Sequence, residues 1–91
     1  MKILSQWLKS RKMQKVFDKI NDLSHERIME LMRDQKFHNA IMQADKYNVV
    51  GSIMTMDMVA ARELSRAVRT NLRVIASDPD DYPFIDLSKV L

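Results

Sequence analysis

Four arginines recur at helical spacing in the stretch RELSRAVRTNLR, at Arg62, Arg66, Arg69 and Arg73. Intervals of four, three and four residues place the side chains on one face of an α-helix. At about 1.5 Å per residue the row is roughly 16 Å long. A guanidinium group binds carboxylate or phosphate through two parallel hydrogen bonds, so the row could contact an anionic surface.

Three interpretations of the arginine row remain open. The first is a solvated helix face with weak ion pairs, each worth about 0–1 kcal/mol. The second is a contact with an acidic protein surface, for example the aspartate-rich end of a second copy. The third is a contact with nucleic-acid phosphates. No aromatic residues interleave with the row, and a net charge of +3 is low for a dedicated nucleic-acid binder. We therefore rank the interpretations in the order given, with the last two close together.

A second basic region lies in the N-terminal segment. This Lys9–Lys19 patch consists of Lys9, Arg11, Lys12, Lys15 and Lys19. Before it stands a hydrophobic group, the Trp7 stripe, formed by Ile3, Leu4, Trp7 and Leu8. At helical spacing this stripe points nearly opposite to a later one made of Met13, Val16, Phe17 and Ile20. We expect a break near residues 9–12; otherwise the Trp7 stripe faces a partner. Membrane binding is disfavoured, because the stripe lasts only two turns.

Catalytic and metal-binding patterns are weak. His25 and His38 are the only histidines, and no nucleophile or phosphate-loop motif is present. His25 follows the helix cap expected at Ser24, so we expect it to be exposed. A row of oxygen and imidazole groups occurs at intervals of four residues: Glu26, Glu30, Asp34 and His38. Such a row could hold a divalent ion, but rows of this kind usually form a solvated helix face. We expect no enzyme activity, no catalytic residue, no metal site and no cofactor.

The composition predicts an all-α protein with a single domain covering residues 1–91. The chain has one glycine and two prolines, and 46% of its residues are hydrophobic. It has no cysteine, which suits a reducing compartment. No apolar run is long enough to span a membrane, and the N-terminus does not resemble a secretory signal. These features predict a soluble, cytoplasmic protein.

Hydrophobic periodicity predicts three main helices, or four or five pieces if the longer ones break. The first covers residues 2–22. The second begins after Ser24 and reaches about residue 46, with a break at Asp34 as the alternative. Residues 47–52 form a turn in which Asn48 and Gly51 suit left-handed geometry. The last helix starts at Ser52 or Thr55 and ends at Ser77, with a continuous apolar face from Ile53 to Ile75.

Residues 78–91 change in character, with both prolines, four aspartates and several apolar residues. We expect an extended acidic and apolar strap that docks either on the helical bundle of residues 1–77 or on a neighbouring molecule. Two off-phase stripes and this tail are more apolar surface than a small monomer hides easily, so we expect a homodimer. We predict a non-enzymatic binding or regulatory protein that docks on another macromolecule, with a protein as the favoured partner. The alternative is a small basic nucleic-acid-binding protein.

Overall fold

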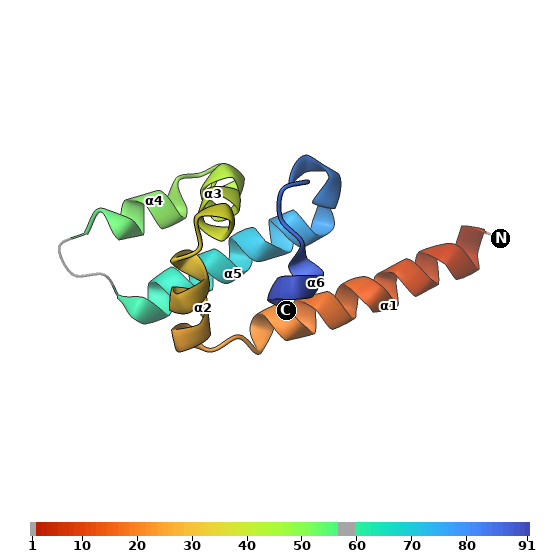
Figure 1. Cartoon of the computed structure of the whole chain (residues 1–91). Helices are drawn as coiled ribbons and strands as arrows, with labels where there is room; N and C mark the ends of the chain where they lie inside the picture. Colours follow the sequence, from red (N-terminus) through yellow and green to blue (C-terminus); the bar gives the residue numbers. More distant parts are fainter. Residues whose placement is uncertain (1, 57–59) are drawn as a thin grey trace.

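A computed structural model describes the backbone of residues 2–56 and 60–91, and the side chains of residues 11–56 and 60–91. The described residues form an elongated helical domain, 53 Å long and 23 Å across (Figure 1). It contains no strand in the described ranges, which confirms the all-α prediction. The elements are α1 (Lys2–Asn21), α2 (His25–Met32), α3 (Gln35–Ala44), α4 (Val49–Met54), α5 (Ala61–Ser77), the 3-10 turn η1 (Pro79–Asp81) and α6 (Leu87–Val90). No described helix is long and apolar enough to cross a membrane.

Helix α1 is continuous, and the break expected near residues 9–12 was wrong. The segment contains no glycine or proline to interrupt it. Its second stripe provides the contact with the core: Ile20 is fully buried and Val16 and Phe17 are partly buried. The N-terminal part of α1 extends beyond the other elements (Figure 1). The side chains of the Trp7 stripe lie outside the described residues.

Helices α2 and α3 are separate, as the alternative break at Asp34 predicted. The Ser24 hydroxyl accepts a hydrogen bond from Arg27 N–H and caps α2. The Asp34 carboxylate accepts from the N–H groups of Lys36 and Phe37 and caps α3. This second cap explains the phase shift in the apolar pattern, because each short helix turns its own face to the core.

The last helix starts later than the sequence predicted, at Ala61, and a separate helix α4 precedes it. The Asp45 carboxylate accepts hydrogen bonds from the N–H groups of Val49, Val50 and Gly51, which explains why α4 starts directly after the turn. The predicted continuous face from Ile53 was therefore wrong, since Met56 belongs to neither helix and is 51% exposed.

The turn before α4 depends on Asn48 and Gly51. Asn48 has a φ of 54°, which confirms its left-handed geometry. Gly51 does not adopt that geometry but is helical, so its predicted role was wrong. A Cβ atom at Gly51 would collide with Asn48 Oδ1. The close contact here is with the end of the exposed Asn48 side chain, which would have to move if Gly51 carried a Cβ atom.

The C-terminal segment is not an extended strap. Asp78 ends α5, the backbone turns through η1, and α6 forms a final turn of helix. Tyr82 is only 4% exposed, and Phe84 is exposed. Four later apolar residues are partly buried against the core: Ile85, Leu87, Val90 and Leu91. The tail is therefore docked as expected, with local turns in place of extended backbone.

Helix α5 is the centre of the fold, because it packs against each of α1, α2, α3 and α4. One side of it is buried among them, including Leu64, Val68, Leu72 and Ile75. Full burial of each such aliphatic side chain contributes about 1.5–3 kcal/mol to folding. The opposite side of α5 remains on the surface and carries the arginines.

Candidate docking face and adjoining pocket

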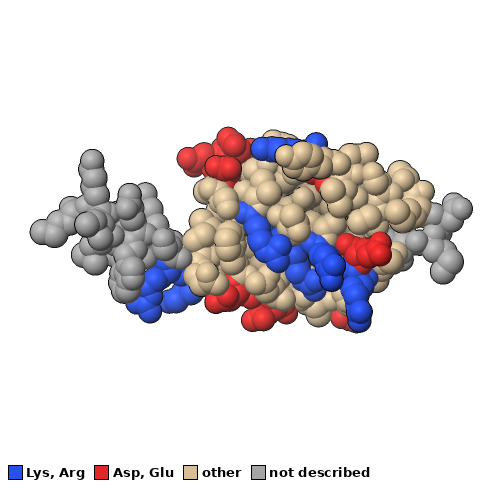
Figure 2. Space-filling model, turned by 180° about the vertical axis from the view of Figure 1, so that it is seen from behind, with Lys and Arg blue, Asp and Glu red and all other residues tan. Residues whose placement is uncertain are grey.

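The four arginines of α5 form a continuous band on the protein surface. We call Arg62, Arg66, Arg69 and Arg73 the arginine band. Figure 2 shows Lys and Arg side chains in a diagonal line along α5, on the face opposite to that seen in Figure 1. The four positions therefore share one face of α5, as their helical spacing indicated.

The inner half of the band, Arg69 and Arg73, holds the connection between α1 and α2. Arg69 Nη2 donates a hydrogen bond of 2.6 Å to the Leu23 carbonyl oxygen, and Arg73 Nη2 donates one of 2.6 Å to Asn21 Oδ1. Both side chains are half-buried. Arg69 Nε is buried and has no hydrogen-bond partner within the described part of the chain. These two arginines are therefore part of the fold as well as of the surface.

The outer half of the band, Arg62 and Arg66, is exposed. Over the residues whose side chains are described, none of the four band arginines forms an ion pair, and the one ion pair recorded joins Arg27 to Glu30 at 3.0 Å. The acceptors of the inner half, Leu23 and Asn21, are uncharged. The band therefore has no carboxylate partner among the described side chains, and the exposed outer half remains consistent with a solvated helix face.

Carboxylates border the band without pairing with it. Figure 2 shows Asp and Glu side chains above, below and beside the line of basic residues. The positive surface is consequently narrow, only one row of side chains wide. A ligand with closely spaced negative charges on all sides would meet these carboxylates and be repelled.

The Lys9–Lys19 patch lies partly on the same face. Arg11, Lys12, Lys15 and Lys19 are all exposed, whereas the side chain of Lys9 lies outside the described residues. In Figure 2 basic side chains also appear next to the grey N-terminal atoms, separated from the band by uncharged and acidic surface. Part of the basic surface near the N-terminal end therefore lies on the same side of the molecule as the band, but it does not merge with the band.

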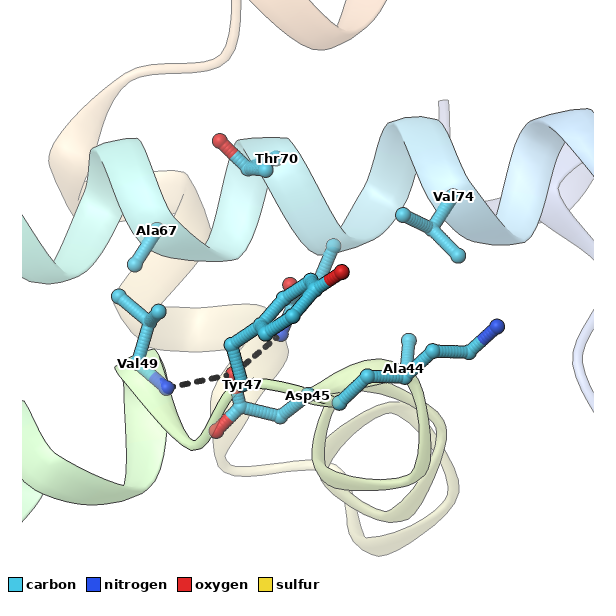
Figure 3. Close-up of a pocket in the computed structure, with 9 residues that line it drawn as sticks. Ala44, Asp45, Tyr47, Val49, Ala67, Thr70 and Val74 are labelled. Atoms are coloured by element: carbon cyan, nitrogen blue, oxygen red, sulfur yellow. Dashed lines mark hydrogen bonds between the residues drawn. The ribbon is translucent and has the colours of Figure 1, made fainter.

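Next to the band, a small pocket lies between α5 and the turn that joins α3 to α4 (Figure 3). Its volume is about 170 Å³. Small apolar side chains form its walls: Ala44, Val49, Ala67 and Val74. Asp45, Asn71, Thr70, Lys46 and Tyr47 supply its polar atoms. The pocket was not predicted from the sequence, because it joins segments that are far apart in the chain.

Asp45 holds the wall of this pocket in place. Besides the three N–H groups of α4, its Oδ1 accepts a hydrogen bond of 3.3 Å from Asn71 Nδ2. Partial burial alone would raise the pKa of Asp45, but the bonds from Gly51, Val50, Asn71 and Val49 together lower the pKa below its ordinary value. The Asp45 carboxylate therefore has a structural role.

Asn71 is the buried polar residue at the base of the pocket, 6% exposed. Its Nδ2 donates to the Ile41 carbonyl oxygen at 3.1 Å as well as to Asp45. Both partners only accept hydrogen bonds, which fixes the orientation of the amide. A signal for this residue was present in the sequence: Asn71 interrupts the apolar face of α5, where a polar group needs a buried partner.

His25 and Ser65 form a contact that the sequence did not predict. His25 was expected to be exposed but is half-buried, and its Nδ1 lies 2.7 Å from Ser65 Oγ. Ser65 is fully buried in the interface between α2 and α5. The pair resembles a nucleophile and its base in composition only, because a substrate cannot reach the hydroxyl. It joins two helices.

The row of possible metal ligands from Glu26 to His38 is interrupted, since Asp34 ends one helix and caps the next. The described residues contain no group of three or more His, Cys, Asp or Glu side chains that could hold a metal ion.

Comparisons with protein-family models, curated proteins and solved structures find no match to this chain. The case for function therefore rests on the surfaces described above.

Proposed function

We propose that this chain is a non-enzymatic binding protein that docks on an acidic surface of another protein through the arginine band. The observation that carries the proposal is the unpaired charge of the band: four guanidinium groups on one helix face, with no carboxylate partner among the described side chains. Guanidinium groups are enriched at protein interfaces, where they bind carboxylates with two hydrogen bonds.

The shape of the band favours a protein partner over nucleic acid. The positive surface is one side chain wide and has carboxylates on its borders (Figure 2). An acidic helix or loop presents a comparably narrow line of charge. A nucleic-acid backbone carries phosphates over a broader surface and would approach the bordering carboxylates.

One observation supports nucleic acid as the second candidate. The Lys9–Lys19 patch has exposed basic residues on the same side of the molecule as the band (Figure 2). If both regions contact phosphates, the association constant falls steeply with salt, with a slope of about −0.9 for each phosphate contacted on duplex DNA. A protein partner gives a shallower dependence.

Capture from native lysate, with and without nuclease, separates the two candidates. The informative variant is Arg62→Glu/Arg66→Glu, because Arg69 and Arg73 also support the fold. Lys36→Glu/Lys89→Glu is the matched control, with the same change of charge at two exposed lysines elsewhere. A protein that survives nuclease and is lost only with the arginine variant supports the proposal. Recovery of nucleic acid that digestion removes would support the second candidate, and equal capture by all forms would refute both.

Self-association as a dimer stays a prediction. Sedimentation velocity at several protein concentrations measures it directly. A species twice the monomer mass that dissociates on dilution is the expected result, and a monomer at all concentrations would contradict it.

A further inference from the structure

The pocket opens directly beside the arginine band. Thr70, which lines the pocket, is four residues after Arg66 and three before Arg73, so it is a surface neighbour of both. Its hydroxyl donates a hydrogen bond to the Arg66 carbonyl oxygen at 3.1 Å and remains exposed. A segment that lies along the band therefore passes the mouth of the pocket.

The pocket has the size of one aromatic ring. Its volume is about 170 Å³, and an apolar cavity of about 150 Å³ is enough to bind benzene. The walls formed by Ala67, Val74 and Val49 carry no polar side-chain atoms. Figure 3 shows Ala67 and Val49 on one side and Val74 on the other, with the Tyr47 ring drawn between them. Such walls suit a flat apolar group.

The base of the pocket also offers a hydrogen-bond acceptor. Asn71 Oδ1 accepts no hydrogen bond from any described residue, although the side chain is 94% buried. The amide cannot turn to satisfy this oxygen, because Nδ2 is held by the Ile41 carbonyl and the Asp45 carboxylate. Among the described side chains, Arg69 Nε is the one fully buried nitrogen or oxygen atom that lacks a hydrogen-bond partner. Because Asn71 Oδ1 also lacks a partner, it must retain some exposed surface. A ligand that enters the pocket with an O–H or N–H group would complete the bonding of Asn71.

Tyr47 and Lys46 stand at the mouth. The Tyr47 side chain is 91% exposed, and its ring reaches from the turn toward α5 (Figure 3). The turn itself is fixed by Asp45 and by the left-handed Asn48. An exposed aromatic ring on a rigid turn can stack on a second ring at little cost in entropy. Lys46 also lines the pocket and is exposed, so it adds a positive charge there.

We propose that this pocket receives a tyrosine or tryptophan side chain of the partner, whose phenol or indole donor binds Asn71 Oδ1. Acidic residues next to that aromatic residue contact Arg66 in the band and Lys46 at the pocket. The inference rests on the proposed docking function and specifies its partner: an acidic segment with a single aromatic anchor. Aromatic residues are common among the few that dominate the energy of such interfaces.

The pocket is tested first with uncharged probes, p-cresol and toluene, added to the isotopically labelled full chain and followed by NMR. The expected result is that p-cresol shifts the amide signals of Thr70, Asn71 and Val74 and binds about tenfold more tightly than toluene, which lacks the donor. Val74→Trp fills the pocket from a half-buried position and should abolish the shifts. Equal binding of the two probes, or shifts that persist in Val74→Trp, would overturn the inference.

The partner class is tested with an acidic peptide that has a central tyrosine, compared with its phenylalanine and alanine counterparts. The order of affinity should be tyrosine, then phenylalanine, then alanine. Tyr47→Ala should weaken the tyrosine peptide about fivefold, whereas Met54→Ala, an exposed apolar residue outside the pocket, should not. Equal affinity of the three peptides would overturn the inference.

The two proposals fail in different ways. Arg62→Glu/Arg66→Glu should leave p-cresol binding unchanged, because the probe has no charge, but it should weaken all three peptides. If that variant binds the peptides as wild type does, the docking function is wrong while the pocket stands. If it loses the peptides but tyrosine gives no advantage over alanine, the docking function stands and the aromatic anchor is wrong.

Discussion

The two halves of the arginine band have the same residue type and lie on the same helix face at helical spacing, but their roles in the structure differ. Arg69 and Arg73 are half-buried and hold the connection between α1 and α2, whereas Arg62 and Arg66 are exposed. The difference comes from what packs beside α5. Near its C-terminal half the end of α1 supplies oxygen acceptors, and near its N-terminal half no described residue does so. A surface row can therefore be partly structural and partly available to a partner.

The largest difference that we expect between the two halves is in the free energy of unfolding, when Arg69 is substituted. Arg69→Ala removes the hydrogen bond to the Leu23 carbonyl and the packing of the half-buried side chain. We expect a loss of about 2 kcal/mol in the free energy of unfolding, measured by urea denaturation. Arg66→Ala should change it by less than about 0.5 kcal/mol. Equal losses at the two positions would remove the distinction between the halves.

A smaller effect is expected at the more exposed contact between Arg73 and Asn21. Arg73→Ala and Asn21→Ala should each lower the free energy of unfolding by about 1 kcal/mol. The double variant should lose less than the sum, because the two side chains share one interaction. Full additivity in this cycle would show that the hydrogen bond contributes nothing to the fold.

Asp45 contrasts with the exposed arginines, because both of its carboxylate oxygens accept hydrogen bonds within the fold. Its pKa is lower in the folded chain than in the unfolded one, so the folded state holds fewer protons there. This stabilisation is present above the unfolded pKa and is lost as pH falls through the folded value. Urea denaturation from neutral pH to below pH 4 should show stability falling, and Asp45→Asn should reduce that dependence. An unchanged pH profile in Asp45→Asn would contradict the assignment.

Local signals in the sequence determined much of the fold. Ser24 and Asp34 act as caps because their side chains reach N–H groups two or three residues ahead, and Asn48 tolerates the left-handed turn. The separate helix α4 was missed because Asp45 accepts hydrogen bonds from N–H groups as far along the chain as Gly51, which spacing alone does not reveal. Helix α1 has no break because it contains no glycine or proline, although the shift in its apolar pattern predicted a break.

The candidate site was predicted only in part. The arginine spacing identified the face, since all four positions depend on one helix. The division of that face could not be predicted, because the acceptors at Asn21 and Leu23 come from about 50 positions earlier in the chain. The pocket depends in the same way on Asn71 meeting Ile41 and Asp45 across two helices. In the sequence, the only indication of the pocket was Asn71, a polar residue within the apolar face of α5.

The smallest expected effect on stability belongs to the outer half of the band, and it provides the most direct test of the central claim. Arg62→Glu/Arg66→Glu and the control Lys36→Glu/Lys89→Glu are compared for unfolding in urea and for partner capture from nuclease-treated lysate. We predict that both variants stay within about 1 kcal/mol of wild type in stability, and that only the arginine variant loses the captured protein. An arginine variant that folds and captures the same protein as wild type would contradict the account.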